Sequence, residues 1–140
     1  MEFEKLKNNP LFLIGLGICW GEGDKTYNGR IAVINTDPEL LLIVAKFYRQ
    51  CLRISDSILR IGLFIYEDIH QETAIKFWSD KLDIPPSQFI KVQMLKSRSN
   101  LAKNKSKYGI CSLYFSNTEL NVKIHEWIRL LSIHNFAGIV

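Results

Sequence analysis

Apolar and polar residues follow each other along the chain with two different periods, one of which predicts helices and the other strands. An unbroken apolar run covers residues 11–20 and stops at the polar sequence Gly21-Glu22-Gly23-Asp24. The run is about half of the roughly 20 residues that span a bilayer, so it predicts a buried helix over about residues 10–22. Apolar residues at helical spacing predict further helices over about residues 38–52, 69–82 and 116–132.

Alternation with a period of two predicts the strands. Residues 24–27 and 30–35 flank Asn28-Gly29, the dipeptide that most favours a tight hairpin turn. Further strands are expected over residues 57–66, 89–96 and 108–116. Their inward positions are apolar and comprise Leu59, Ile61, Leu63 and Ile65 in the first, Ile90, Val92 and Met94 in the second, and Cys111, Leu113 and Phe115 in the third.

The order of these elements predicts an α+β fold for residues 1–140 as a single domain. Helix starts are expected at Asp37, at Asp68 with Gln71, and at Ser116 with Glu119, because these pairs match N-cap and capping-box patterns. Residues 1–9 form a polar leader that we expect to be mobile at its start. The sheet is predicted to be mixed or largely antiparallel, with the helices on one face.

Charge and cysteine content indicate which kind of partner and which cellular compartment to expect for the protein. The 140 residues carry 18 Lys and Arg against 14 Asp and Glu, a net charge of +4, which suits a polyanionic partner. The three cysteines are widely spaced within apolar runs, which is typical of reduced core residues rather than of a disulfide or zinc site. The chain has no basic signal region, so we expect an intracellular protein, bacterial, archaeal or organellar, that is not secreted and has no membrane partner.

Glycines inside the first apolar helix are costly, at about 1 kcal/mol each relative to alanine. Gly17 and Gly21 lie four residues apart and therefore on one face of the helix. Small residues on one face allow a second helix to approach closely. The carboxylate of Glu22 would then emerge where two such helices meet.

Residues 15–23, GLGICWGEG, resemble a divergent LAGLIDADG motif, the signature of the LAGLIDADG homing endonucleases. Gly17 matches the glycine at the third position of the motif, Gly21 the small seventh residue and Glu22 the acidic eighth residue. Trp20 stands where the family often has its first aspartate. The resemblance implies a site-specific DNA endonuclease with a saddle-shaped, largely antiparallel sheet that lies on DNA.

A single motif implies a homodimer acting on a long, roughly palindromic duplex. The motif helices would pair through Leu13, Gly17 and Gly21. The resemblance also implies that Glu22 is the catalytic ligand of Mg2+ or another divalent cation. Asn35 matches the position of a polar residue near the catalytic water. The position of the family's catalytic lysine falls on Asn117 or Thr118, so Lys96 and Lys107 are the candidates to replace it.

DNA contacts are predicted from the outward positions of the strands and from a basic loop. Residues 96–107 contain five basic residues and no acidic one, which suits contact with phosphates. Arginine and glutamine can read bases in the major groove, while lysine and serine hold phosphates. The predicted contacts are Lys25, Arg30, Arg60, Lys91, Gln93, Arg98, Lys103, Lys105, Ser112 and Tyr114.

Two alternatives remain open. A protein of the same fold that has lost cleavage would be a DNA-binding regulator or an RNA-binding maturase. The missing lysine favours this reading, whereas Glu22 favours the endonuclease. A plainer alternative is an α+β domain without a nucleic-acid partner, in which the glycine-rich helix serves only dimer packing.

Overall fold

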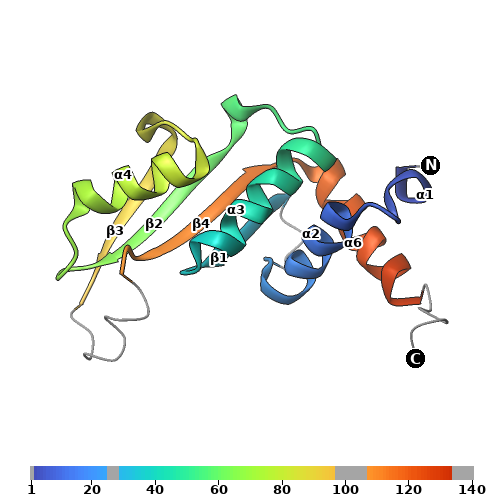
Figure 1. Cartoon of the computed structure of the whole chain (residues 1–140), viewed down its shortest axis with the longest axis horizontal. Helices are drawn as coiled ribbons and strands as arrows, with labels where there is room; N and C mark the ends of the chain where they lie inside the picture. The colour runs from blue at the N-terminus through green and yellow to red at the C-terminus, as the bar shows by residue number, and fades with distance from the viewer. Residues whose placement is uncertain (1, 25–28, 97–106, 134–140) are drawn as a thin grey trace.

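The computed structural model describes residues 2–24, 29–96 and 107–133, and a mixed sheet forms the centre of this part of the chain (Figure 1). Its strands β1 (Arg30–Asn35), β2 (Arg60–Tyr66), β3 (Phe89–Leu95) and β4 (Ile110–Ser116) lie in the order β1-β4-β2-β3. Strand β4 pairs antiparallel with β1 and β2, whereas β2 and β3 are parallel. The predicted α+β class and mixed sheet are confirmed.

Helices cover one face of this sheet and its β1 end. Helices α3 (Pro38–Lys46) and α4 (Gln71–Leu82) lie over the same face (Figure 1), and Val33, Leu63 and Leu113 are buried there. Helices α2 (Pro10–Glu22) and α6 (Thr118–Ile133) pack on each other and on β1. The opposite face of the sheet is therefore left without a helical layer in the described residues.

The helix predicted over residues 10–22 is α2, and its start has a local cause. The side chain of Asn9 accepts hydrogen bonds from the backbone of Leu11 (2.9 Å) and Phe12 (3.3 Å), and Pro10 occupies the first turn. The predicted cap at Asp37 is also confirmed, with its carboxylate accepting from the backbone of Glu39. The helix expected to continue to residue 52 instead changes at Phe47 into a π-helical turn, Phe47–Cys51.

Two other predicted helix starts are wrong by one or two residues. Helix α4 is capped by the His70 side chain, which accepts from the backbone nitrogen of Thr73, rather than by Asp68. Helix α6 is capped by Asn117, whose Oδ1 accepts from the backbone nitrogen of Leu120 at 3.0 Å, rather than by Ser116. Capping depends on which side chain reaches the free N–H groups of the first turn, and adjacent polar residues compete for this role.

The polar leader is helical and packed on the core from Glu2 onward, whereas we expected its start to be mobile. Residues Glu2–Leu6 form the short helix α1. Phe3 is buried edge-on against Phe12 of α2, with ring centroids 6.2 Å apart, and Glu2 pairs with Lys123 of α6 at 2.9 Å. Two apolar residues, Phe3 and Leu6, therefore anchor a segment whose other described residues are polar.

The predicted inward side of the strand over residues 89–96 is the clearest error. Ile90 is 60% exposed and Met94 is 53% exposed, although both were expected in the core. Strand β3 is an edge strand, and the register shifts between Ile61 and Gly62, which leaves Ile90 unpaired with β2. Alternation alone cannot distinguish an edge strand, where the covering layer ends, from a central one.

Of the hairpin predicted over residues 24–35, the structure describes the pairing of the two strands only at the base. Gly23 pairs with Val33 as an isolated antiparallel bridge, and the Asp24 nitrogen donates to the Ala32 carbonyl at 3.0 Å. The rest of the predicted first strand, residues 25–28, lies outside the described residues. The last strand begins at Ile110, two residues later than predicted, after Gly109 with a φ of +91°.

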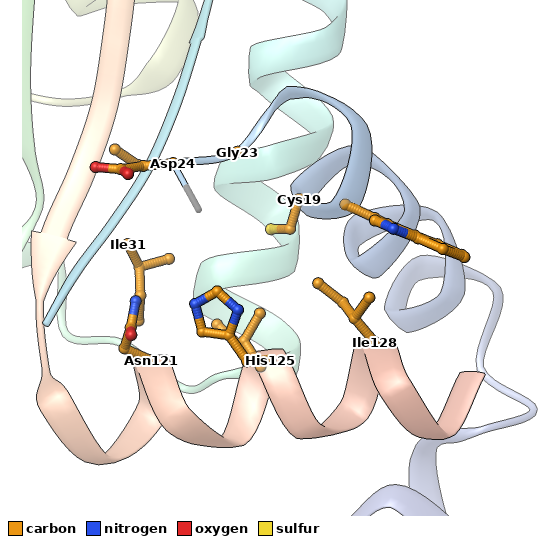
Figure 2. Close-up of a pocket in the computed structure, with 10 residues that line it drawn as sticks. Cys19, Gly23, Asp24, Ile31, Asn121, His125 and Ile128 are labelled. Carbon is orange, nitrogen blue, oxygen red and sulfur yellow. The ribbon is translucent and has the colours of Figure 1, made fainter. Parts of the chain in front are cut away.

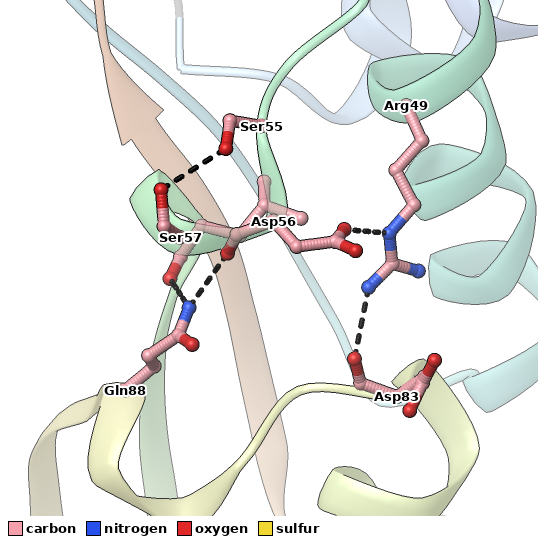
Figure 3. A network of polar contacts seen from close by, with 7 residues as sticks. Arg49, Ser55, Asp56, Ser57, Asp83 and Gln88 are labelled. Carbon is pink, nitrogen blue, oxygen red and sulfur yellow. Dashed lines mark hydrogen bonds and ion pairs between the residues drawn. The ribbon is translucent and has the colours of Figure 1, made fainter.

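A polar network joins the loops at one end of the sheet (Figure 3). The Arg49 guanidinium, just beyond α3, donates from Nε to the Asp56 carboxylate (2.6 Å) and from Nη2 to the Asp83 carbonyl (3.0 Å). The Gln88 amide donates to the backbone carbonyls of Asp56 (2.8 Å) and Leu59 (2.6 Å). These bonds tie the end of α3 to the segments that enter β2 and β3, and so fix α4 and β3 relative to the core.

Candidate functional site

Helix α2 has two apolar faces with different surroundings. One face is buried, with Phe12, Gly15, Leu16 and Cys19 turned into the core. On the other, Ile14 is 51% and Trp20 47% exposed. A helix that is apolar all round is normally buried all round, so the second face is apolar surface that one chain leaves uncovered.

The glycines of α2 divide between these two faces. A methyl group at Gly15 would overlap the ring of Phe47 and lie 2.8 Å from its Cβ, so only glycine fits there. A methyl group at Gly17 or Gly21 would meet nothing within 4 Å. The close approach expected at Gly17 and Gly21 therefore has no partner within the described residues, although the expected face, with half-buried Leu13 beside it, is accessible.

Glu22 is the last residue of α2, and its side chain is exposed. The C-terminus of a helix carries partial negative charge, which disfavours a carboxylate by about 0.3–1 kcal/mol. No basic residue in the last turn offsets this repulsion. The described residues contain no cluster of three or more His, Cys, Asp or Glu side chains that would hold a metal ion, so this part of one chain does not provide a complete cation site around Glu22.

Asn35 lies nearest to Glu22 among the other predicted catalytic residues. The bridge between Gly23 and Val33 brings the end of α2 alongside β1, and Asn35 follows Val33 by two residues, about 7 Å along a strand. The Asn35 Oδ1 atom accepts from the backbone nitrogen of Asp37 at 2.9 Å, which shapes the turn into α3. Its oxygen is thus already engaged in local structure.

Lys96 and Lys107 do not approach Glu22 within one chain. Lys96 follows β3, at the opposite edge of the sheet from β1, and three strand spacings amount to about 14 Å. Lys107 lies at the same corner as the end of β3, with its Nζ 5.8 Å from the ring centroid of Tyr108, just before β4. Figure 1 shows this corner at the far end of the molecule from α2.

The four strands supply cations and no acid to the open face of the sheet. The four strands contain no Asp or Glu, and their only basic residues are Arg30, Arg60 and Lys91. The strand register places all three on the face opposite the buried one: Arg60 pairs with Tyr114, and Lys91 pairs with Gly62. This face is therefore electrostatically suited to a polyanion.

Individual side chains on this face differ in how available they are. The Arg30 guanidinium lies over the ring of Tyr114, 4.4 Å from its centroid. Arg60 donates to the backbone carbonyls of Ser57 (2.7 Å) and Leu59 (2.9 Å), and Gln93 is half-buried. Ser112 is only 6% exposed in the central strand, so its predicted contact with a phosphate is poorly placed.

The remaining predicted DNA contacts, Lys25, Arg98, Lys103 and Lys105, lie outside the described residues. The prediction for these four side chains therefore stays a prediction.

A cavity that the sequence did not predict lies where α2, β1 and α6 meet (Figure 2). Asn121 and His125 of α6 line it together with Ile124 and Ile128. One signal was present in the sequence: Asn121 precedes Ile124 by three residues and Ile128 by seven, so a polar residue stands on the apolar stripe of that helix.

No helix in the described residues is both long and apolar enough to span a membrane. Comparison of the chain with protein-family models, with curated proteins and with solved structures found no match.

Proposed function

We propose that this chain is a divalent-metal-dependent DNA endonuclease of the LAGLIDADG type, which acts as a homodimer paired through α2. The observation that carries the proposal is the end of α2, where an uncovered apolar helix face runs directly into the exposed carboxylate of Glu22. Pairing of this face across a two-fold axis would bury it and bring two Glu22 carboxylates together.

The shape of the uncovered face supports a helix partner. Gly17 and Gly21 leave a bare strip of backbone with open space above it, flanked by the exposed side chains of Ile14 and Trp20. A tryptophan beside small residues is typical of protein interfaces, since the large ring of one copy fills the space that the small residues leave. In a dimer the cost of the two glycines in helix propensity would be offset by closer packing.

The position of Glu22 supports a cation ligand. A carboxylate at the negative end of a helix is destabilising by itself, and a divalent cation would reverse this repulsion. One carboxylate is a weak site, but two, completed by phosphate oxygens of DNA, provide the hard oxygen ligands that Mg2+ prefers. The bound ion would polarise the scissile phosphate and lower the pKa of the attacking water.

The open face of the sheet supports DNA as the polyanion. Arg30, Arg60 and Lys91 lie on this face without any acidic residue on the strands, and Gln93 offers a side-chain amide that pairs with adenine. In the proposed dimer, two such faces would contact a long, roughly palindromic duplex. Phosphate contacts from Lys25 and from the basic residues of the loop 96–107 would add to them.

A cleavage-deficient protein of the same fold is the second candidate, and the position of the lysines favours it. Lys96 and Lys107 lie at the corner of the sheet remote from Glu22, so neither supplies a cation beside the proposed metal. Such a protein would bind DNA as a regulator, or RNA as a maturase, and would keep α2 only for pairing.

The test is cleavage of a pool of random duplexes by the wild type, by Glu22→Gln and by the control Glu72→Gln, which changes an exposed glutamate on α4. We expect cutting in Mg2+ by the wild type and by Glu72→Gln at a two-fold-symmetric site. Glu22→Gln should retain DNA without cutting it. Retention without cutting by all three proteins would select the second candidate, and full activity of Glu22→Gln would refute the metal ligand.

A further inference from the structure

The cavity between α2, β1 and α6 has the character of a small-molecule site. Its volume is about 250 Å³, and its walls are largely apolar, with Trp20 from α2, Ile31 from β1, and Ile124 and Ile128 from α6. Figure 2 shows the His125 ring rising from α6 into the space between these elements. An apolar enclosure with a few polar groups is the usual form of a ligand pocket.

Asn121 determines which hydrogen bond an occupant of this cavity can form. Its side chain is 4% exposed and lines the cavity, and its Nδ2 atom donates to the Arg30 carbonyl at 3.1 Å. Within the described residues no donor reaches its Oδ1 atom. A buried acceptor without a hydrogen bond is costly, so the cavity favours an occupant that donates a hydrogen bond.

The other polar groups restrict the class of occupant. Among the described residues that line the cavity, Asp24 is acidic and none is Lys or Arg, which disfavours an anion. Burial raises the pKa of the Cys19 thiol to about 12, so this side chain is a neutral wall rather than a nucleophile. The occupant is therefore neutral or cationic, and no covalent step is expected.

We propose that the cavity binds a planar nitrogen heterocycle of one or two rings, whose ring N–H donates to the Asn121 Oδ1 atom and whose faces pack between Ile31, Ile124 and Ile128. A cavity of about 150 Å³ holds benzene, so the larger volume here suits a fused bicycle. This inference does not rest on the proposed nuclease function: Trp20 is the one wall residue that the proposed helix pairing also uses, and the residues that would contact the ligand, Asn121, Ile31, Ile124 and Ile128, are not assigned to DNA contact, metal binding or helix pairing.

The test is an NMR titration of the whole 15N-labelled chain with indole and with benzofuran, which has the same shape but no N–H donor. Indole should shift the amide signals of Asn121, His125 and Gly23 in a saturable way. Benzofuran should bind about fivefold more weakly, the effect of one ordinary hydrogen bond. The absence of saturable shifts with indole, or equal affinity for the two probes, would overturn the proposal.

A cavity-filling variant and its control locate the binding. Ile128→Trp should abolish indole binding by occupying the cavity, whereas Val122→Trp changes an exposed position of the same helix that does not line it and should bind as the wild type does. If the spectrum of Ile128→Trp shows an unfolded chain, Ala32→Leu fills the same cavity from β1. Unchanged indole binding in a folded filling variant would contradict this location.

Discussion

The two faces of α2 have nearly the same composition but opposite relations to the rest of the chain. On the inner face, Gly15 is required because Phe47 occupies the space that a side chain would need, and Phe12 packs on Trp127 with ring centroids 5.4 Å apart. On the outer face, a methyl group at Gly17 or Gly21 would meet none of the described residues within 4 Å, and Ile14 and Trp20 are about half exposed. The inner face thus explains the fold, while Gly17 and Gly21 of the outer face contribute no packing within the described residues.

The largest expected difference between the faces comes from truncating one apolar residue on each. Phe12→Ala removes a fully buried ring and should lower the free energy of unfolding by about 3–5 kcal/mol. Ile14→Ala, on the outer face, should change it by less than about 0.5 kcal/mol. Urea unfolding at concentrations where the chain is monomeric measures both. Similar losses for the two variants would mean that the outer face is also packed within one chain.

The second contrast comes from the same Gly→Ala substitution on each face, which should change the free energy of unfolding in opposite directions. Gly15→Ala places a methyl group against Phe47 and should destabilise the fold by about 1–3 kcal/mol, as overpacking does. Gly17→Ala meets open space and should stabilise the monomer by about 0.5–1 kcal/mol through helix propensity. Thermal unfolding distinguishes them, and a melting temperature lowered by Gly17→Ala would show that this glycine has a contact within the chain.

A smaller effect tests the burial of Cys19 on the inner face through the pH dependence of the free energy of unfolding. Burial raises the pKa of Cys19 from an ordinary value of 9.0 to about 12. A thiol whose pKa is raised on folding contributes its full stability below pH 9 and loses it as the pH rises toward 12, because only the unfolded thiol ionises there. The loss should be about 1.4 kcal/mol per pH unit above 9. Cys19→Ala should reduce this slope in unfolding curves between pH 8 and pH 10 relative to the wild type, and the slope that remains should come from the Cys111 thiol, whose pKa is also raised by burial. An unchanged slope would contradict the assignment to Cys19.

Elements with strong local signals were predictable from the sequence. The bounds of α2, the cap at Asp37 and the inward residues of β2 and β4 follow from N-cap residues and from unambiguous periodicity. Features that depend on what lies next to an element were not predictable. The exposure of Met94 depends on β3 being the edge strand, and the anchoring of α1 depends on Phe3 meeting Phe12.

The candidate site was predictable in part for the same reason. The accessible face of α2 and the position of Glu22 follow from the spacing of residues on one helix. The separation of Lys96 from Glu22 follows from the strand order, which places β1 and β3 at opposite edges. A single sequence gives no measure of strand order, so a residue beyond the motif cannot be assigned to the site from the sequence alone.

The most direct test of pairing through the outer face of α2 is sedimentation equilibrium of the wild type, of Gly17→Leu and of Lys76→Leu, which adds the same side chain to an exposed position of α4. We predict twice the chain mass of 16.2 kDa for the wild type and for Lys76→Leu, and the mass of one chain for Gly17→Leu. A wild type that remains monomeric at all concentrations, or a Gly17→Leu variant that remains dimeric, would contradict the proposed pairing.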